Sequence, residues 1–171
     1  MFKRLFAMKK AFLITVIVLC VPVIAAAQEY PKAEVGVGYS YLRGDFDANF
    51  NGWNFSVAGN PTRWFGVVGE ISGVYVDELK LHTFLVGPKF SYRGDSRLNP
   101  YVQTLVGAAH ASNGSGETGF AWTLGGGLDV KVHKNVAIRV FEATYLLTRF
   151  FEENQHNGRL SAGVVFRFGG N

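Results

Sequence analysis

The sequence predicts an all-β fold in which eight antiparallel strands run up and down and close into a barrel. Large apolar residues alternate with small or polar residues in eight separate segments, which is the period-two pattern of strands with two different faces. No part of residues 28–171 shows a convincing helical period. A meander of this kind leaves two unpaired edge strands, and pairing the first strand with the last removes both edges.

Four strands are expected in the first half of the barrel. In the segment 33–43, Val35, Val37 and Tyr39 share one face, while glycine and serine occupy the other. The same contrast defines three further strands: 51–59, 63–76 and 81–93. These segments are longer than the usual globular strand of about 5–6 residues.

Four more strands follow in the second half: 101–111, 120–132, 136–150 and 158–168. The first of them has an ambiguous pattern, so its facing stays open. In the segment 136–150 the alternation slips near Phe141 and Glu142. Because a β-bulge places an extra residue in one strand, this slip predicts a bulge.

The connections between these strands fall into two alternating sets. The first set is 60–63, 93–100 and 133–135, and the second set is 44–50, 77–80, 112–118 and 151–157. The second set is more acidic and mostly longer. Because the connections of a meander alternate between its two ends, each set should lie at one end. An even number of strands then places both termini beside the first set.

The N-terminal segment 1–27 has the composition of a secretory signal peptide. Four basic residues and no acidic ones precede an apolar run, which closes on a small-residue cleavage site at 25–27. A membrane-spanning helix is the alternative, but the run is slightly short of the about 20 apolar residues that a span needs. The expected domains are therefore a cleaved signal peptide, 1–27, and a β-barrel domain, 28–171.

The charge and cysteine content of residues 28–171 exclude several classes of function. The signal segment holds four of the 17 basic residues and none of the 13 acidic ones, so the remainder carries 13 of each sign. A balanced chain lacks the basic excess that nucleic-acid binding needs. The single cysteine, Cys20, lies in the signal segment, so the barrel domain has no disulfide and no thiolate metal site.

Alternation alone leaves two kinds of barrel open. A soluble lipocalin-like barrel turns its apolar face inward, whereas a membrane barrel turns it toward lipid and fills a narrow interior with small and polar residues. The many glycines on the polar faces favour the membrane barrel, because glycine marks the bends and close packing that a tightly curved interior needs. The predicted fold class is therefore an eight-stranded antiparallel up-and-down transmembrane β-barrel, with the lipocalin-like binder as an alternative.

Five charged residues lie well within the predicted strands, on the faces that hold small and polar residues: Glu70, Lys89, Asp129, Arg139 and Arg167. A turn around Lys134 places Asp129 opposite Arg139, and a turn at 77–80 places Glu70 diagonal to Lys89. Opposite charges suit a closed interior, because an unpaired buried charge is costly. We expect these residues to form structural ion pairs in the lumen.

The chain ends on the aromatic strand "SAGVVFRF", residues 161–168. Four residues match the C-terminal assembly signal of bacterial outer-membrane proteins, which has a polar residue, a glycine two residues on and alternating aromatics: Ser161, Gly163, Phe166 and Phe168. With stretches such as "GGGLDVKV", residues 33–168 resemble the small bacterial outer-membrane β-barrel domain family, akin to OmpA and OmpX barrels. One departure is that three residues follow the last aromatic.

The stretch "HASN" resembles the His-x-Ser-Asn stretch of outer-membrane lipid A deacylases, which are also eight-stranded barrels. In those enzymes a histidine and a serine two residues on act as base and nucleophile, with an acid orienting the histidine. His110 and Ser112 share a strand face if the strand continues that far, and Glu117 is the nearest acid. The residues 112–118 also have the composition of a plain polar turn.

The resemblance implies a location in the outer membrane of a Gram-negative-type bacterium. It also implies contacts with outer-membrane lipid and lipopolysaccharide and, during biogenesis, with the barrel-assembly machinery and periplasmic chaperones. We expect a monomeric, non-enzymatic barrel with a structural or surface-interaction role, no cofactor and no metal. The alternatives are a narrow porin-like channel, a lipid A deacylase-like enzyme that uses His110 and Ser112, and the lipocalin-like binder.

Overall fold

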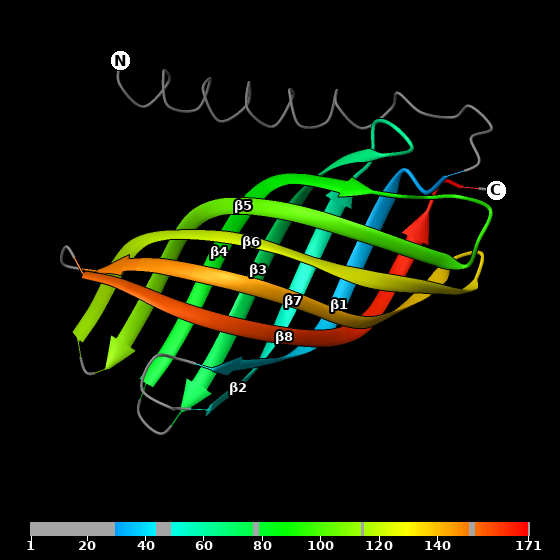
Figure 1. Ribbon diagram of the computed structural model, residues 1–171. Coiled ribbons are helices and arrows are strands. Elements are labelled where there is room, and N and C mark those ends of the chain that lie inside the picture. The colour runs from blue at the N-terminus through cyan, green and yellow to red at the C-terminus, as the bar shows by residue number, and fades with distance from the viewer. Residues whose placement is uncertain (1–29, 44–48, 77–78, 114, 151–152, 171) are drawn as a thin grey trace, which may run out of the picture.

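The computed structural model describes residues 30–43, 49–76, 79–113, 115–150 and 153–170, so the predicted signal peptide lies outside the described residues. The described chain forms eight β-strands (Figure 1). None of its segments is a helix long and apolar enough to cross a membrane. The strands are β1 (Ala33–Arg43), β2 (Asn49–Gly59), β3 (Phe65–Val76), β4 (Leu79–Ser91), β5 (Leu98–Asn113), β6 (Ser115–His133), β7 (Val136–Phe150) and β8 (Glu153–Phe168).

The strands close into one antiparallel barrel in chain order. The predicted closing pair is present, because β1 pairs with β8 from Ala33 opposite Phe168 to Arg43 opposite Gly158. Both ends of the described chain therefore lie at the same end of the barrel (Figure 1). We call this the terminal end. The opposite, distal end carries the β5–β6 hairpin.

Three distal connections are shorter than the sequence predicts. β4 begins at Leu79, which pairs with Val76, and β8 begins at Glu153, which pairs with Phe150. The β5–β6 ladder continues to the pair Asn113 and Ser115. Polar composition suggested connections there, but the pairing of main-chain groups extends through Ser-, Asn- and Gly-rich segments, since strand preference depends on context. The fourth predicted connection, 44–50, lies mostly outside the described residues.

The barrel encloses charged and polar side chains together with a cluster of smaller apolar ones, and its outer face is apolar. Glu70 and Glu142 are fully buried, whereas Phe84 and Leu124 expose 53% of their surface. Most large apolar residues of the strands share this outward exposure, as a wall that faces lipid requires. A lipocalin-like barrel has the reverse polarity, so that alternative is wrong.

The predicted bulge lies in β7 at Val140 and Phe141. Arg139 pairs with Gly163 of β8, and the next pair is Glu142 with Ser161, so two residues of β7 lie opposite one of β8. Both bulge residues are exposed. The extra residue lets Arg139 and Glu142, three positions apart, both face the lumen.

Candidate functional site in the barrel lumen

Nine charged side chains are buried in the described part of the lumen, five cations and four anions. They are Glu34, Glu70, Lys89, Arg93, Asp129, Arg139, Glu142, Arg159 and Arg167. Ion pairs within 4.0 Å connect all of them into one network. We call it the lumen network.

Glu34 of β1 is the centre of the network at the terminal end. One carboxylate oxygen lies 3.1 Å from the Nζ atom of Lys89, and the other lies 3.2 Å from Nη2 of Arg93. The Nε atom of Arg167 is more distant, at 3.9 Å from Oε1 of Glu34. One carboxylate therefore serves three cations, drawn from β4, the segment that follows β4, and β8.

Arg139 joins the two halves of the network. Its guanidinium forms two hydrogen bonds with Asp129, at 2.9 and 3.2 Å, and a third with Glu142 at 2.8 Å. Asp129 lies opposite Arg139 in the β6–β7 ladder, as the turn at Lys134 predicts. A bidentate pair of this kind fixes the orientation of both groups.

Arg159 of β8 completes the network toward the distal end. Its Nη2 atom lies 2.6 Å from Glu70 Oε1 and 3.5 Å from Glu142 Oε1. Its Nη1 atom donates a hydrogen bond to Ser72 at 3.3 Å. Two carboxylates from different strands therefore share one guanidinium.

Tyr101 of β5 packs at the middle of the lumen network. The Lys89 Nζ atom lies 4.2 Å from the ring centroid, and the Arg139 Cζ atom lies 4.7 Å from it. The hydroxyl of Tyr101 donates a hydrogen bond to Glu142. Cations over an aromatic face are attracted to its negative π-cloud, so this ring contributes to holding both cations.

The predicted pairing of Glu70 with Lys89 is wrong. Glu70 lies opposite Leu85, and Lys89 lies opposite Gly66, because the β3–β4 connection is shorter than predicted. The partner of Glu70 is Arg159, and Lys89 contacts Glu34 and Asp129. These partners reach across the lumen from strands that are not neighbours.

Five residues of the site were not predicted from the sequence: Glu34, Arg93, Tyr101, Glu142 and Arg159. Glu142 was obscured by the bulge, which moves it from the outward to the inward register. Glu34 lies at the start of β1, on the face that holds glycine and serine. That position was the available signal, since a charge on the small-residue face of a barrel strand points into the lumen.

Side chains fill the lumen around this network. The cavities beside Glu34, Lys89 and Arg139 have volumes of about 10 Å³ each, which is room for about one water molecule. Inward apolar residues, including Leu105 and Leu146, are also fully buried. Eight strands enclose an interior that side chains can fill, and the buried charged and apolar side chains occupy it here.

The four residues of the predicted assembly signal lie in β8, which closes the barrel. Ser161 faces the lumen, where its Oγ atom is 3.0 Å from Ser40 Oγ. Gly163 pairs with Gly38, and a side chain at Gly163 would overlap the carbonyl oxygen of Val37. The remaining two, Phe166 and Phe168, face outward with 44% and 50% of their surface exposed.

His110, Ser112 and Glu117 do not form a hydrolase triad. His110 and Ser112 share the outward face of β5, but the His110 Nδ1 atom is hydrogen-bonded to Thr118 Oγ1 at 2.9 Å. Glu117 lies opposite Ala111, on the inward face of β6. The acid and the histidine therefore point to opposite sides of the barrel wall. The described residues also contain no group of three His, Cys, Asp or Glu side chains that could hold a metal.

Aromatic and polar side chains alternate on the outer surface toward the distal end. Tyr39 donates a hydrogen bond to Asn51 at 2.5 Å, and Trp53 donates one to Tyr75 at 3.2 Å. The Tyr145 hydroxyl and the Nδ1 atom of His156 are also hydrogen-bonded to each other. Such amphipathic rings are typical of a membrane–water interface.

Three exposed cations lie on the outer face near the distal strand ends: Arg43, Lys80 and Arg149.

Comparison with known proteins identifies the type of barrel. Residues 11–168 match the family model described as "Outer membrane protein beta-barrel domain". A search of curated proteins found no match. Among solved structures, the chain is similar to Neisserial surface protein A (NspA), with a TM-score of 0.65 and 15% identity over 80% of this chain and 96% of that chain.

Two further structures support the same fold. Ail, the attachment invasion locus protein of Yersinia pestis, gives a TM-score of 0.53 and 21% identity over 82% of this chain and 99% of that chain. The N-terminal β-barrel domain of Pseudomonas aeruginosa OprF gives a TM-score of 0.53 and 17% identity over 84% of this chain and 100% of that chain. At these identities the likeness concerns the fold.

Proposed function

Because the chain belongs to the outer membrane protein β-barrel domain family, we propose that it is a non-enzymatic, closed barrel that stabilises the outer membrane through its outer surface. The observation that carries this proposal is the lumen network. It fills the middle of the interior with paired charges, so we assign the membrane-stabilising role to the outer wall. The porin-like alternative requires a water-filled path, and the filled lumen does not favour it.

The outer surface suits contact with lipopolysaccharide. The exposed cations Arg43, Lys80 and Arg149 lie at the distal strand ends, where they can reach the phosphates of a lipid headgroup region. Lysine and arginine bind phosphate through charge-assisted hydrogen bonds. The aromatic residues next to them, such as Trp53 and Tyr75, would then lie at the level of the headgroups.

In this proposal the distal end faces outward from the cell and the terminal end faces the periplasm. Export depends on residues 1–27 as a cleaved signal peptide. Assembly depends on the closing strand β8, whose outward aromatics Phe166 and Phe168 act as the recognition feature for the assembly machinery. The closed ladder leaves no edge strand for pairing with another copy, which supports a monomer.

Envelope permeability in the native bacterium tests the proposal. Deleting the gene should increase uptake of a large hydrophobic dye, and the wild-type protein should restore exclusion. A triple variant, Arg43→Gln, Lys80→Gln and Arg149→Gln, should not restore it because its phosphate contacts are lost. Lys32→Gln, which removes a charge at the terminal end, is the matched control and should restore exclusion.

The amount of each variant in the outer membrane is compared by its gel shift, since a membrane barrel stays folded in detergent until it is boiled. If the folded amounts are equal, the failure of the triple variant to restore exclusion reflects lost phosphate contacts and not failed assembly. Unchanged permeability on deletion, or full restoration by the triple variant, would contradict the proposal.

A further inference from the structure

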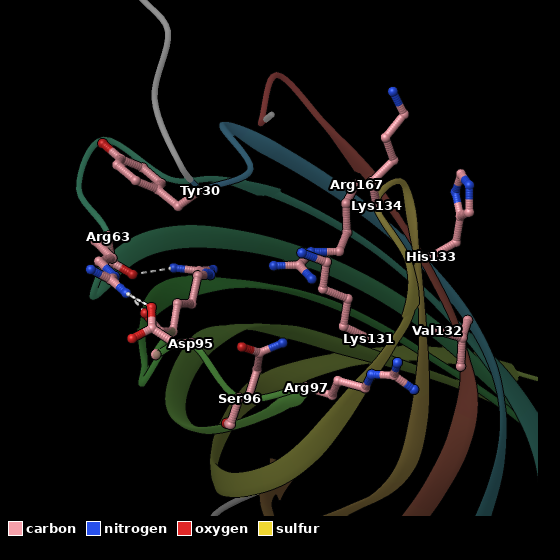
Figure 2. Close-up of a pocket in the computed structure, with 13 residues that line it drawn as sticks. Tyr30, Arg63, Asp95, Ser96, Arg97, Lys131, Val132, His133, Lys134 and Arg167 are labelled. Atoms are coloured by element: carbon pink, nitrogen blue, oxygen red, sulfur yellow. Dashed lines mark hydrogen bonds and ion pairs between the residues drawn. The ribbon is translucent and has the colours of Figure 1, made fainter.

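A pocket of about 560 Å³ opens at the terminal end of the barrel. Its wall is formed by Tyr30, the β2–β3 and β4–β5 connections, the start of β5, the end of β6, the β6–β7 turn and the end of β8 (Figure 2). The pocket is therefore ringed by segments from around the barrel mouth. Arg93 and Arg167 line the pocket and also belong to the lumen network, so the pocket adjoins the network at its terminal end.

The pocket wall is strongly basic. Six of its lining residues are cationic: Arg63, Arg93, Arg97, Lys131, Lys134 and Arg167. The lining contains one carboxylate, Asp95, which lies 3.8 Å from Arg63 on the outer rim. Because residues 28–171 carry equal numbers of positive and negative residues, this local excess is a feature of the arrangement and not of overall composition.

Arg167 and Lys131 are the two cations best placed to hold a ligand. Figure 2 shows their side chains pointing toward one another across the mouth, while Lys134 and His133 point away from it. Lys131 is exposed, whereas Arg167 retains only 8% of its surface. Neither side chain has a hydrogen-bonded acid partner among the described residues, so two like charges converge without an anion between them.

The buried Arg167 is a second and independent indication of a ligand. Its Nη1 atom is buried and lacks a hydrogen-bond partner within the described chain. Its nearest carboxylate, Glu34, is closer to both Lys89 and Arg93. The lumen network holds five cations against four anions, and Arg167 is the cation that this imbalance leaves poorly compensated. A buried guanidinium with little compensating charge is costly, and an anion in the adjoining pocket lowers that cost.

We infer that this pocket binds the phosphate group of an anionic ligand. Phosphate presents several acceptor oxygens, which match the converging guanidinium and ammonium donors. The amide of Asn99, also in the pocket wall, adds a neutral donor. The volume falls within the range of roughly 300–1,000 Å³ of small-molecule sites. The phosphate comes either from a soluble phosphate compound or from an anionic lipid headgroup beside the barrel rim.

Calorimetric titration of the folded chain in zwitterionic detergent micelles, with inorganic pyrophosphate as the probe, tests the inference. The wild type should show saturable binding that weakens as salt is added. Lys131→Ala and Arg167→Gln should each weaken binding at least about tenfold, because each removes a charge-assisted contact. Lys32→Ala removes the same charge as Lys131→Ala at a position outside the pocket lining and should leave binding unchanged.

The Lys131 variant keeps the test decisive if Arg167→Gln folds poorly, because Lys131 is exposed and outside the lumen network. A second arm uses nanodiscs of phosphatidylcholine with and without phosphatidylglycerol, observed by phosphorus NMR. Pyrophosphate binding that depends on Lys131 identifies a soluble ligand. A phosphatidylglycerol shift with the same dependence, and no pyrophosphate binding, identifies a lipid headgroup. Absence of saturable binding in both arms, or equal binding by Lys131→Ala and the wild type, overturns the inference.

Discussion

Glu142 is the residue through which the central part of the lumen network is connected. It contacts Arg139 at 2.8 Å and Arg159 at 3.5 Å, and it accepts a hydrogen bond from Tyr101. It is fully buried. Because two guanidinium groups rely on it, loss of its charge leaves positive charge uncompensated in a region without bulk water.

Glu142→Gln should lower the free energy of unfolding by about 3–5 kcal/mol, the usual cost of removing one partner from a buried ion pair. Glutamine keeps the side-chain volume, so the decrease in the free energy of unfolding reflects the lost charge and not a new cavity. The measurement is urea-induced unfolding in lipid vesicles, followed by tryptophan fluorescence. Asp95→Asn removes a carboxylate from an exposed pair and should have little effect. Equal effects of the two substitutions would contradict the role of Glu142.

Partners in the site could be predicted from the sequence only where they lie on neighbouring strands. Asp129 and Arg139 face each other across one turn, so a turn position was enough to pair them. Glu70 and Arg159 come from β3 and β8, and Glu34 and Lys89 come from β1 and β4. Barrel curvature and tilt bring these pairs together across the lumen, and no local pairing rule contains that information.

At the scale of the strand, the β7 bulge decides which residues form the site. A regular strand would place residues 139 and 142 on opposite faces. The slip of the sequence pattern near Phe141 predicted the bulge, since apolar residues occur there in succession. The same pattern could not set the facing of β5, where small residues occupy both faces. The structure places Tyr101 and Leu105 of that strand inside and Val102 and Val106 outside.

Single-residue deletions in β7 test this account of the bulge. Deleting Val140 removes the extra residue and keeps Arg139 and Glu142 facing inward, so the protein should still fold with a modest loss of stability. Deleting Tyr145 from the regular part of the strand inverts the facing on one side of the deletion, which places polar or charged groups in lipid. The heat-dependent gel shift should therefore persist in the first deletion and disappear in the second. The bulge assignment would be wrong if the two deletions behaved alike.

At the scale of the whole molecule, the fold followed from alternation, strand count and the need to close an edge. The alternating pattern recurs in every strand. An error in the predicted bounds of one strand therefore did not change the predicted fold. The hairpin lengths were less predictable, because polar strand ends outside an apolar band have the same composition as turns. The β5–β6 pair shows this best, since its ladder runs through residues predicted as a connection.

The whole barrel combines an apolar outer wall with an interior closed by nine connected charges. This arrangement gives the lumen network a structural role, because each charge in a membrane-embedded interior needs a partner. It also separates the two surfaces that we assign to binding. The distal cations face outward, and the basic pocket faces the barrel axis at the terminal end.

Planar-bilayer recording of the folded protein tests the central claim of a closed lumen most directly. Insertion is verified by the gel shift of protein recovered from the same preparation, and a wide porin in the same lipid shows that open channels are detected. We predict no stable conductance steps for the wild-type barrel, because ion-paired side chains fill the middle of the lumen and the cavities beside them are about the size of one water molecule. Large, stable channel openings would contradict the account.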